Sequence, residues 1–232
     1  AFGLALSYFT IIVVINSFNL IDGVDGLAAS LGVLTMTVFG IYFFVIDYQA
    51  YALFAFSLAG SLAAFLIFNH HPAKIFMGDS GSLMIGLVNA ILVIKFINVC
   101  DRPSVVVHVT SGVAIGFSIL IVPLLDTLRV FSIRILNGRS PFTPDRNHVH
   151  HLLLDKGLGH AAVTFTCVAI NIMFIMLAWF GRSLGPNYLL LGILILAFSG
   201  LGLLYYGRNR RTIIDRKSTR LNSSHANISY AV

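Results

Sequence analysis

Residues 1–26 read AFGLALSYFTIIVVINSFNLIDGVDG, and this stretch decides the fold class. Its first 21 residues carry no charged side chain. A helix needs about 20 apolar residues to cross a bilayer, so the run is long enough to span one. Polar residues and two Asp-Gly pairs follow at once. The stretch therefore predicts a membrane-spanning helix that ends in a polar turn.

The composition of the whole chain agrees with this prediction. Of 232 residues, 57% are hydrophobic and 10% are charged, whereas soluble domains carry about 25% charged residues. A water-soluble globule is excluded for that reason. The 19 Phe and two Cys exclude a disordered chain and a disulfide scaffold.

Seven apolar stretches recur along the chain, at residues 1–21, 27–46, 50–68, 83–99, 104–125, 163–181 and 187–206. Only helices and closed barrels satisfy their backbone in lipid, and continuous apolar runs are typical of helices rather than of barrel strands. We therefore predict an all-α, polytopic membrane protein with about seven transmembrane helices.

The basic residues are distributed unevenly between the two sets of connecting segments. One set comprises residues 22–26, 69–82, 126–162 and the chain after 207, and it holds nine Lys or Arg up to residue 211. The other set holds Arg102 and Arg182, and Lys95 if its side chain reaches the interface. The positive-inside rule makes the first set cytoplasmic. Membrane topology explains the positive charge, so we expect no nucleic-acid partner.

The two ends of the sequence differ from what a complete membrane domain would show. The chain opens in an apolar span without Met, and we expect an N-terminal part to be missing. Residues 215–232 are polar, and DRKSTRLNSSH resembles a translated sequencing adapter. We expect this segment to be an artefact or a disordered tail. Residues 1–214 would then form one transmembrane catalytic domain, with a cytoplasmic loop at 126–162.

Polar residues gather first at the end of the first span. Asn16, Asn19, Asp22 and Asp25 recur every three residues, so a helix would carry them as one slanted stripe. Glycines follow both Asp residues and allow a ligand to approach the backbone. Helix packing in lipid followed by an ordinary turn is the alternative interpretation. Polar residues at the edge of a span favour a functional site instead.

The second cluster lies at residues 69–82, which read NHHPAKIFMGDSGS. Its Pro and glycines predict a loop, with Asp79 just before the fourth span. Together with the first cluster it places three carboxylates on one surface, and oxygen ligands of this kind suit Mg²⁺. Lys74 is either a phosphate contact or an ordinary positive-inside lysine. The segment lacks the P-loop pattern.

The third cluster lies in the long loop, where residues 141–151 read PFTPDRNHVHH. His148, His150 and His151 have three alternative roles: solvated loop residues, zinc ligands, or groups that bind and exchange protons near phosphate. Arg146 stands beside them.

Taken together, the clusters indicate an enzyme that joins a charged cytosolic substrate to a lipid. A transporter is the rival class, but it should carry its polar residues near the middle of the spans. A purely structural membrane subunit would not explain the clustering.

Three motifs resemble those of the polyprenyl-phosphate N-acetylhexosamine-1-phosphate transferases, the MraY, WecA and TagO types. They are NSFNLIDGVDGLA at 16–28, PAKIFMGDSGSLMIG at 72–86 and PFTPDRNHVHHLLLDKG at 141–157. The resemblance covers about residues 4–210. It implies transfer of a sugar 1-phosphate, N-acetylglucosamine 1-phosphate above all, from a UDP-sugar to undecaprenyl phosphate with release of UMP, as the first step of a cell-envelope glycan.

The resemblance also implies roles for individual residues. It makes Asp79 the ligand of Mg²⁺, which Mn²⁺ could replace. The implied catalytic residues are Asp22, Asp79, His148, His150 and His151. The implied substrate-binding residues are Asn19, Asp25, Phe76 and Arg146, with Asp25 and Phe76 holding uridine and Arg146 contacting an anion.

The His-Val-His-His pattern is similar to the WecA and TagO branch rather than to the phospho-MurNAc-pentapeptide transferases, which remain the alternative within the family. The resemblance implies a multi-pass protein of the bacterial inner membrane, with its site facing the cytoplasm, and it allows a homodimer. The family's tandem Asp-Asp motif is absent from this sequence, so the chain as written is expected to be inactive.

Overall fold

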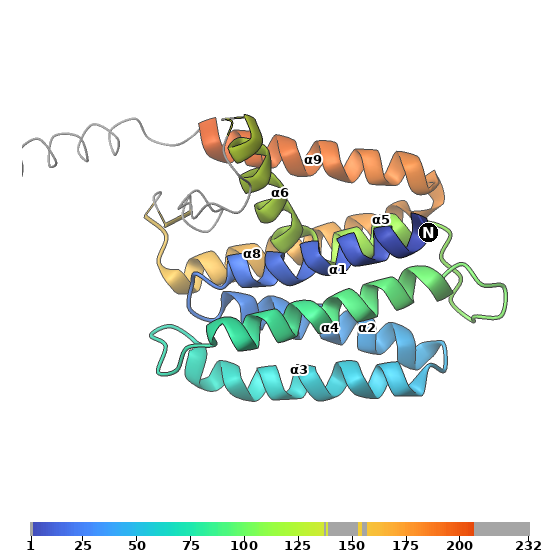
Figure 1. The fold of residues 1–232 in the computed structure, drawn as a ribbon, viewed down its shortest axis with the longest axis horizontal. Helices are drawn as coiled ribbons and strands as arrows, with labels where there is room; N and C mark the ends of the chain where they lie inside the picture. The colour runs from blue at the N-terminus through green and yellow to red at the C-terminus, as the bar shows by residue number, and fades with distance from the viewer. Residues whose placement is uncertain (1, 137, 139–152, 155–156, 207–232) are drawn as a thin grey trace, which may run out of the picture.

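The computed structural model describes residues 2–136, 138, 153–154 and 157–206. These residues form helices joined by short connections and contain no strand. The helices are α1 (Phe2–Ile21), α2 (Leu27–Val45), α3 (Gln49–Asn69), α4 (Gly78–Val99), α5 (Gly112–Ile119), α6 (Ile121–Leu136), α8 (His160–Phe180), the 3₁₀ turn η1 (Gly181–Leu184) and α9 (Pro186–Tyr206). Most of them run side by side as one bundle (Figure 1).

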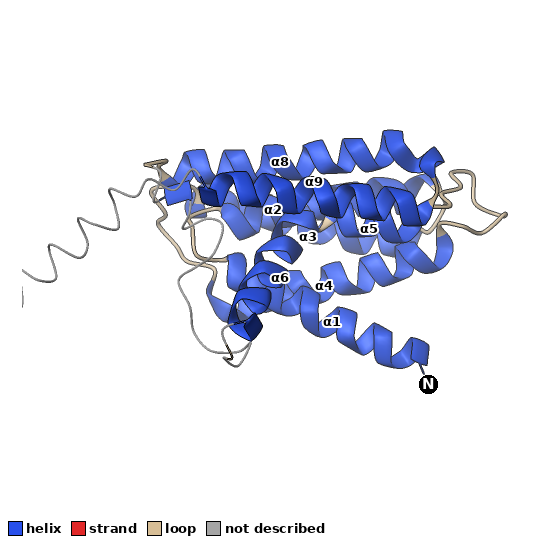
Figure 2. Ribbon diagram, turned by 90° about the horizontal axis from the view of Figure 1, so that it is seen from above, coloured by secondary structure: helices blue, strands red, loops and turns tan. Residues whose placement is uncertain are grey.

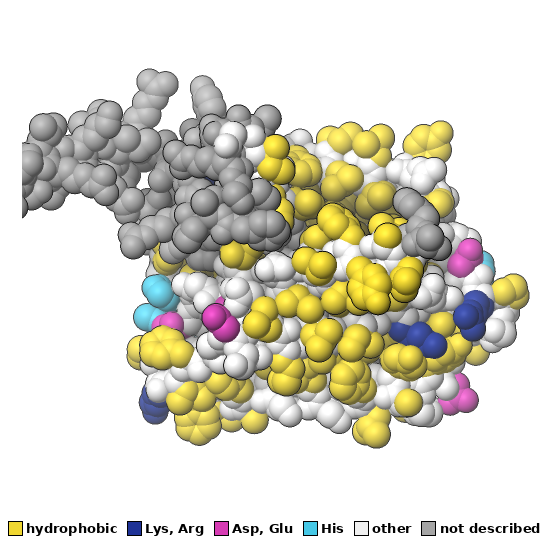
Figure 3. Space-filling view, in the orientation of Figure 1, with side chains coloured by type: hydrophobic (Ala, Val, Ile, Leu, Met, Phe, Trp, Pro, Cys, Tyr) yellow, Lys and Arg dark blue, Asp and Glu magenta, His cyan; other side chains and the backbone are white. Residues whose placement is uncertain are grey.

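The bundle confirms the prediction of a polytopic helical membrane protein. Within the described ranges, six helices are long and apolar enough to cross a membrane, and the bent pair α5–α6 adds a seventh span if it is counted as one. Hydrophobic side chains cover the middle of the face in Figure 3, and charged side chains and histidines lie mainly at its two ends. Large apolar side chains such as Phe165 (75% exposed) and Leu53 (70%) point outward, as lipid contact requires.

The predicted fifth span, 104–125, is wrong in its boundaries and in its shape. The helix begins only at Gly112, and after Ile119 it turns by 84° into α6, which leaves the bundle direction (Figure 1). Asn171 of α8 explains how the break is tolerated. Its side chain donates to Ile119 O at 2.9 Å and accepts from Val122 N–H at 3.2 Å. The polar groups freed by the break are thereby paired away from water.

Two further boundaries differ from the sequence-based expectation. Residues 78–82, predicted as loop, form the first turn of α4, and residues 126–136 of the predicted long loop belong to α6. Gly78 has a φ of +66°, a conformation that glycine adopts at little cost, so the chain can turn directly into the helix. Asp79 then lies in the first turn, where the helix dipole favours a negative charge.

Helices α1 and α4 approach closely at one glycine. A Cβ atom built on Gly86 would lie 2.6 Å from Ile15 Cα and 3.0 Å from Ile15 O, so the two backbones are almost in contact. About one helical turn away from this contact, toward the end of α1 and the start of α4, the Asn19 side chain donates a hydrogen bond to Ser82. The glycine contact therefore sets the distance between the polar ends of these helices.

We expect Gly86→Ala to destabilise the protein, because the added methyl group meets backbone that cannot rotate away. The matched control is Gly60→Ala in α3, where a Cβ meets nothing within 4 Å. An overpacked core position costs about 1–3 kcal/mol, and thermal unfolding in detergent measures the difference. Equal melting temperatures for the two variants would contradict the close contact.

A second expectation concerns the break between α5 and α6. Asn171→Leu should cost about 1–3 kcal/mol, because it leaves buried backbone groups without partners. Asn187→Leu, at the exposed start of α9, should change the free energy of unfolding far less. Unfolding of both variants in the same detergent tests this. If Asn171→Leu lowers the free energy of unfolding no more than Asn187→Leu does, the bend does not depend on the Asn171 hydrogen bonds.

Candidate active site

One end of the bundle collects the polar residues of the first two motifs. The turn after α1, the connection from α3 to α4 and the start of α8 lie at this end, which is on the left in Figure 1. Figure 2, turned by 90°, shows the same grouping. Segments that are far apart in sequence thus lie at one end of the bundle, as expected for connections on the same side of a membrane.

Asn19 joins the two motifs directly. Its side-chain amide N–H donates to Asp79 Oδ1 at 3.2 Å and to Ser82 Oγ at 3.1 Å. Ser82 is buried and Asp79 is exposed, so the amide reaches from the helix interface to a carboxylate at the surface. The contact orients the Oδ1 side of Asp79, and no described residue forms a hydrogen bond with its Oδ2.

Asp22 lies in the turn directly after α1, near Asp79. Partial burial raises the pKa of Asp22 to about 6, and the neighbouring Asp79 carboxylate contributes to the same shift. Two neighbouring carboxylates that repel each other are suited to a hard divalent cation, which prefers oxygen ligands. The residues present therefore fit Mg²⁺.

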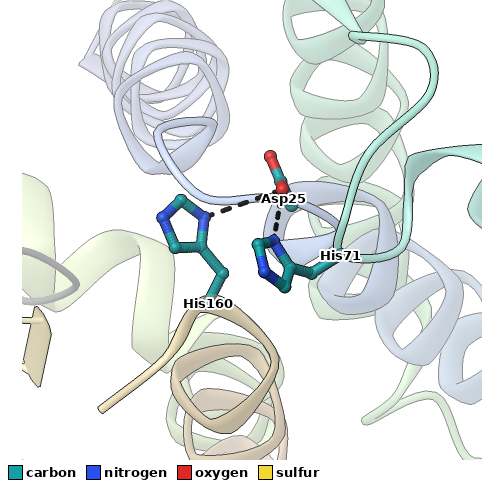
Figure 4. Close-up of side chains that lie close together, drawn as sticks. All are labelled: Asp25, His71 and His160. Carbon is teal, nitrogen blue, oxygen red and sulfur yellow. Dashed lines mark hydrogen bonds and ion pairs between the residues drawn. The ribbon is translucent and has the colours of Figure 1, made fainter. Parts of the chain in front are cut away.

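Asp25 occupies the same turn but has different partners (Figure 4). Its Oδ2 lies 2.8 Å from His71 Nδ1 and accepts the Ala73 N–H at 3.3 Å. His160 Nδ1 is 3.8 Å from the same oxygen. The His71 hydrogen bond lowers the pKa of Asp25, and partial desolvation opposes that effect.

Asn69 fixes the connection that carries Phe76. Its Oδ1 accepts the Gly26 N–H at 3.1 Å, and its Nδ2 donates to Ile75 O at 2.9 Å. The buried amide thus ties the end of α3 both to the turn after α1 and to the segment before α4. Phe76 follows immediately and is 82% exposed, so its ring is free to stack on a planar group.

The structure brings some of the predicted site residues together and not others. Asn19, Asp22 and Asp79 form one group, whereas Asp25 contacts histidines and Phe76 stands on the surface. Four predicted residues lie outside the described ranges, namely Arg146, His148, His150 and His151.

Sequence reasoning assigned no role to His71 or His160. His71 lies in the second polar cluster, residues 69–82, directly before the motif that begins at Pro72, so its type and position mark it as a candidate. His160 sits at the first position of an apolar helix, 135 residues from Asp25, and nothing in the local sequence connects the two.

The raised pKa of Asp22 predicts a pH dependence of stability. In the presence of a chelator, the free energy of unfolding should fall as the pH rises from about 4 to about 6, because the folded protein holds the Asp22 proton more tightly than the unfolded chain. Asp22→Asn should remove this component, and Asp47→Asn in the α2–α3 turn should retain it. Unfolding at several pH values measures it. Parallel profiles for wild type and Asp22→Asn would refute the shift.

Comparison with known proteins yields one family. Residues 1–97 match the model of glycosyl transferase family 4. The undecaprenyl-phosphate alpha-N-acetylglucosaminyl 1-phosphate transferase of Yersinia pestis is 28% identical over 85% of this chain and 54% of its own length. A probable enzyme of the same kind from Bacillus subtilis is 34% identical, over 73% and 45%.

The decaprenyl-phosphate N-acetylglucosaminephosphotransferase of Mycobacterium leprae is 37% identical over 65% of this chain and 41% of its own length. The chain thus spans about half the length of the curated relatives that it matches. The matched residues 1–97 hold Asn19, Asp22, Asp25 and Asp79. On these matches, the chain resembles glycosyl transferase family 4 over residues 1–97 and is similar to its N-acetylglucosamine-1-phosphate transferases over a longer stretch.

Proposed function

We propose that the protein transfers N-acetylglucosamine 1-phosphate from a UDP-sugar to undecaprenyl phosphate and releases UMP. The observation that carries the proposal is the contact of Asn19 with Asp79 beside Asp22, at one end of an apolar bundle. The two carboxylates offer ligands for a cation that also binds phosphate. They lie at the end of the bundle, where a lipid headgroup and a water-soluble donor can both reach them. The names of the relatives supply the sugar and the polyprenyl phosphate.

Asp22 and Asp79 would hold Mg²⁺, or Mn²⁺ in its place. Bound there, the ion would neutralise negative charge on the diphosphate of the donor, which is a main contribution to phosphoryl transfer. The chain's own part is positioning: Asn19 keeps Asp79 oriented, and the α1–α4 packing keeps Asp22 near it.

The remaining residues are assigned to donor binding. Phe76 would stack on the uracil ring, and Asp25 would accept a hydrogen bond from the uridine. Arg146 and the three histidines His148, His150 and His151 would contact the diphosphate or the sugar, where cationic groups stabilise the charge that develops during transfer.

The topology of the proposal follows the distribution of basic residues. The site end of the bundle would face the cytoplasm of a bacterium, and the protein would be a multi-pass component of the inner membrane. A homodimer is compatible with this arrangement. The product would initiate a cell-envelope glycan.

The test assays UMP release by the full-length product of the gene that encodes this chain. UDP-N-acetylglucosamine, undecaprenyl phosphate and Mg²⁺ are supplied together, and each is then left out in turn. We expect release only with all three. Asp79→Asn should lower kcat by at least about 100-fold, the scale of losing one electrostatic group at a reacting centre.

Asp47→Asn is the matched control, since it removes a carboxylate at the opposite end of the bundle and should leave the rate unchanged. Release with UDP-MurNAc-pentapeptide in place of UDP-N-acetylglucosamine would keep the mechanism and correct the donor. Absence of release with every UDP-sugar would reject the transferase and favour a transporter.

A further inference from the structure

A second group of ligand-type side chains lies beside the carboxylates assigned to Mg²⁺. It comprises Asp25, His71 and His160, each of which offers one ligand atom, and these atoms all lie within 4.8 Å of one another. The three residues come from three separate elements: the turn after α1, the connection after α3, and the first position of α8 (Figure 4).

The two imidazole rings are held in parallel. Their centroids are 4.9 Å apart with an interplanar angle of 24°. Both rings direct Nδ1 at Asp25 Oδ2, at 2.8 Å from His71 and 3.8 Å from His160 (Figure 4). His160 Nδ1 is shielded from water, yet it has no hydrogen-bond partner among the described residues. A buried nitrogen of this kind is costly unless a further group binds it.

We propose that Asp25, His71 and His160 form a binding site for a transition-metal ion of the Zn²⁺ class. Two imidazole nitrogens and one carboxylate oxygen suit Zn²⁺ or Co²⁺, whereas Mg²⁺ prefers oxygen ligands alone. Metal–ligand bonds of about 2.0–2.1 Å in a tetrahedron place ligand atoms about 3.3 Å apart. The present separations between the ligand atoms, from 2.8 Å to at most 4.8 Å, lie on both sides of that distance, and three protein ligands would leave a fourth position for another group.

Two hydrogen bonds hold Asp25 in place, one at its carboxylate and one at its main-chain carbonyl. The Ala73 N–H binds Asp25 Oδ2 at 3.3 Å, and the Thr164 hydroxyl, one turn after His160, donates to Asp25 O at 3.0 Å. Partners of this kind orient metal ligands and strengthen binding. Coordination would replace the proton that His71 Nδ1 shares with Asp25, as metal binding to histidine requires.

The site differs in chemistry from the Asp22–Asp79 pair, and the inference does not rest on the proposed transferase activity. A bound ion would connect the end of α1, the end of α3 and the start of α8. Asp25 is also the residue assigned to uridine, so an ion at this site would compete with the nucleotide for the carboxylate.

The test measures metal binding directly on the purified full-length protein in detergent. Co²⁺ is titrated and followed by its visible absorption, and Zn²⁺ affinity is measured by competition with a coloured chelator. His148, His150 and His151 are changed to Ala in every protein compared, so that they cannot contribute. With excess Mg²⁺ present to fill the Asp22–Asp79 site, we expect one Co²⁺ per chain with a tetrahedral spectrum, and two imidazole ligands in the zinc-edge X-ray absorption.

His160→Ala and His71→Ala should each weaken Zn²⁺ binding by more than about 10-fold, since even the loss of an outer-shell partner costs about 10–100-fold. His70→Ala, next to the site, and His108→Ala, beside Asp101 at the other end, are matched controls that should bind as before. Thermal unfolding without metal confirms that each variant folds. His160→Gln is used in place of His160→Ala if the latter does not fold.

The proposal is overturned if the parent protein binds Co²⁺ and Zn²⁺ no more tightly than His160→Ala. It is also overturned if His70→Ala weakens binding as much as His71→Ala. UMP release is measured on the protein that retains His148, His150 and His151. Failure of metal binding with intact UMP release by that protein would reject this site alone, and metal binding without UMP release by that protein would reject the transferase alone.

Discussion

The near contact between α1 and α4 at Gly86 is the constraint on which the polar end of the bundle depends. Because Ile15 lies against a glycine rather than a side chain, the helices stay close enough for Asn19 to reach Asp79 and Ser82. A larger residue would push them apart and separate the two carboxylates. A packing feature within the apolar bundle therefore determines the geometry of a charged site at its end.

In the other half of the bundle, the structure depends on pairing backbone polar groups within the protein. A helix that turns by 84° at membrane depth exposes backbone donors and acceptors that lipid cannot pair. Asn171 of α8 supplies both partners, so the break and α8 are mutually dependent. The bend sends α6 across the bundle, where it packs against α1, the helix that carries Asn19.

Two kinds of ligand chemistry stand side by side at the polar end. Asp22 and Asp79 present oxygen atoms, and their mutual repulsion favours a hard cation. Asp25, three residues after Asp22, instead meets the imidazoles of His71 and His160. One short turn thus serves both groups, because α4 approaches it on one side and α8 on the other.

The membrane class, the seven apolar stretches and the candidate residues Asn19, Asp22 and Asp79 can all be predicted from the amino-acid sequence. These follow from local composition and from motifs within single segments. Three features become visible only in the folded chain: the break before α6, the helical start at Gly78 and the contact of Asp25 with His160. The physical reason is that each depends on backbone conformation or on contacts between residues far apart in the chain. Local periodicity carries no signal for the Asn171 amide, which lies 49 and 52 residues away from the two backbone groups that it pairs.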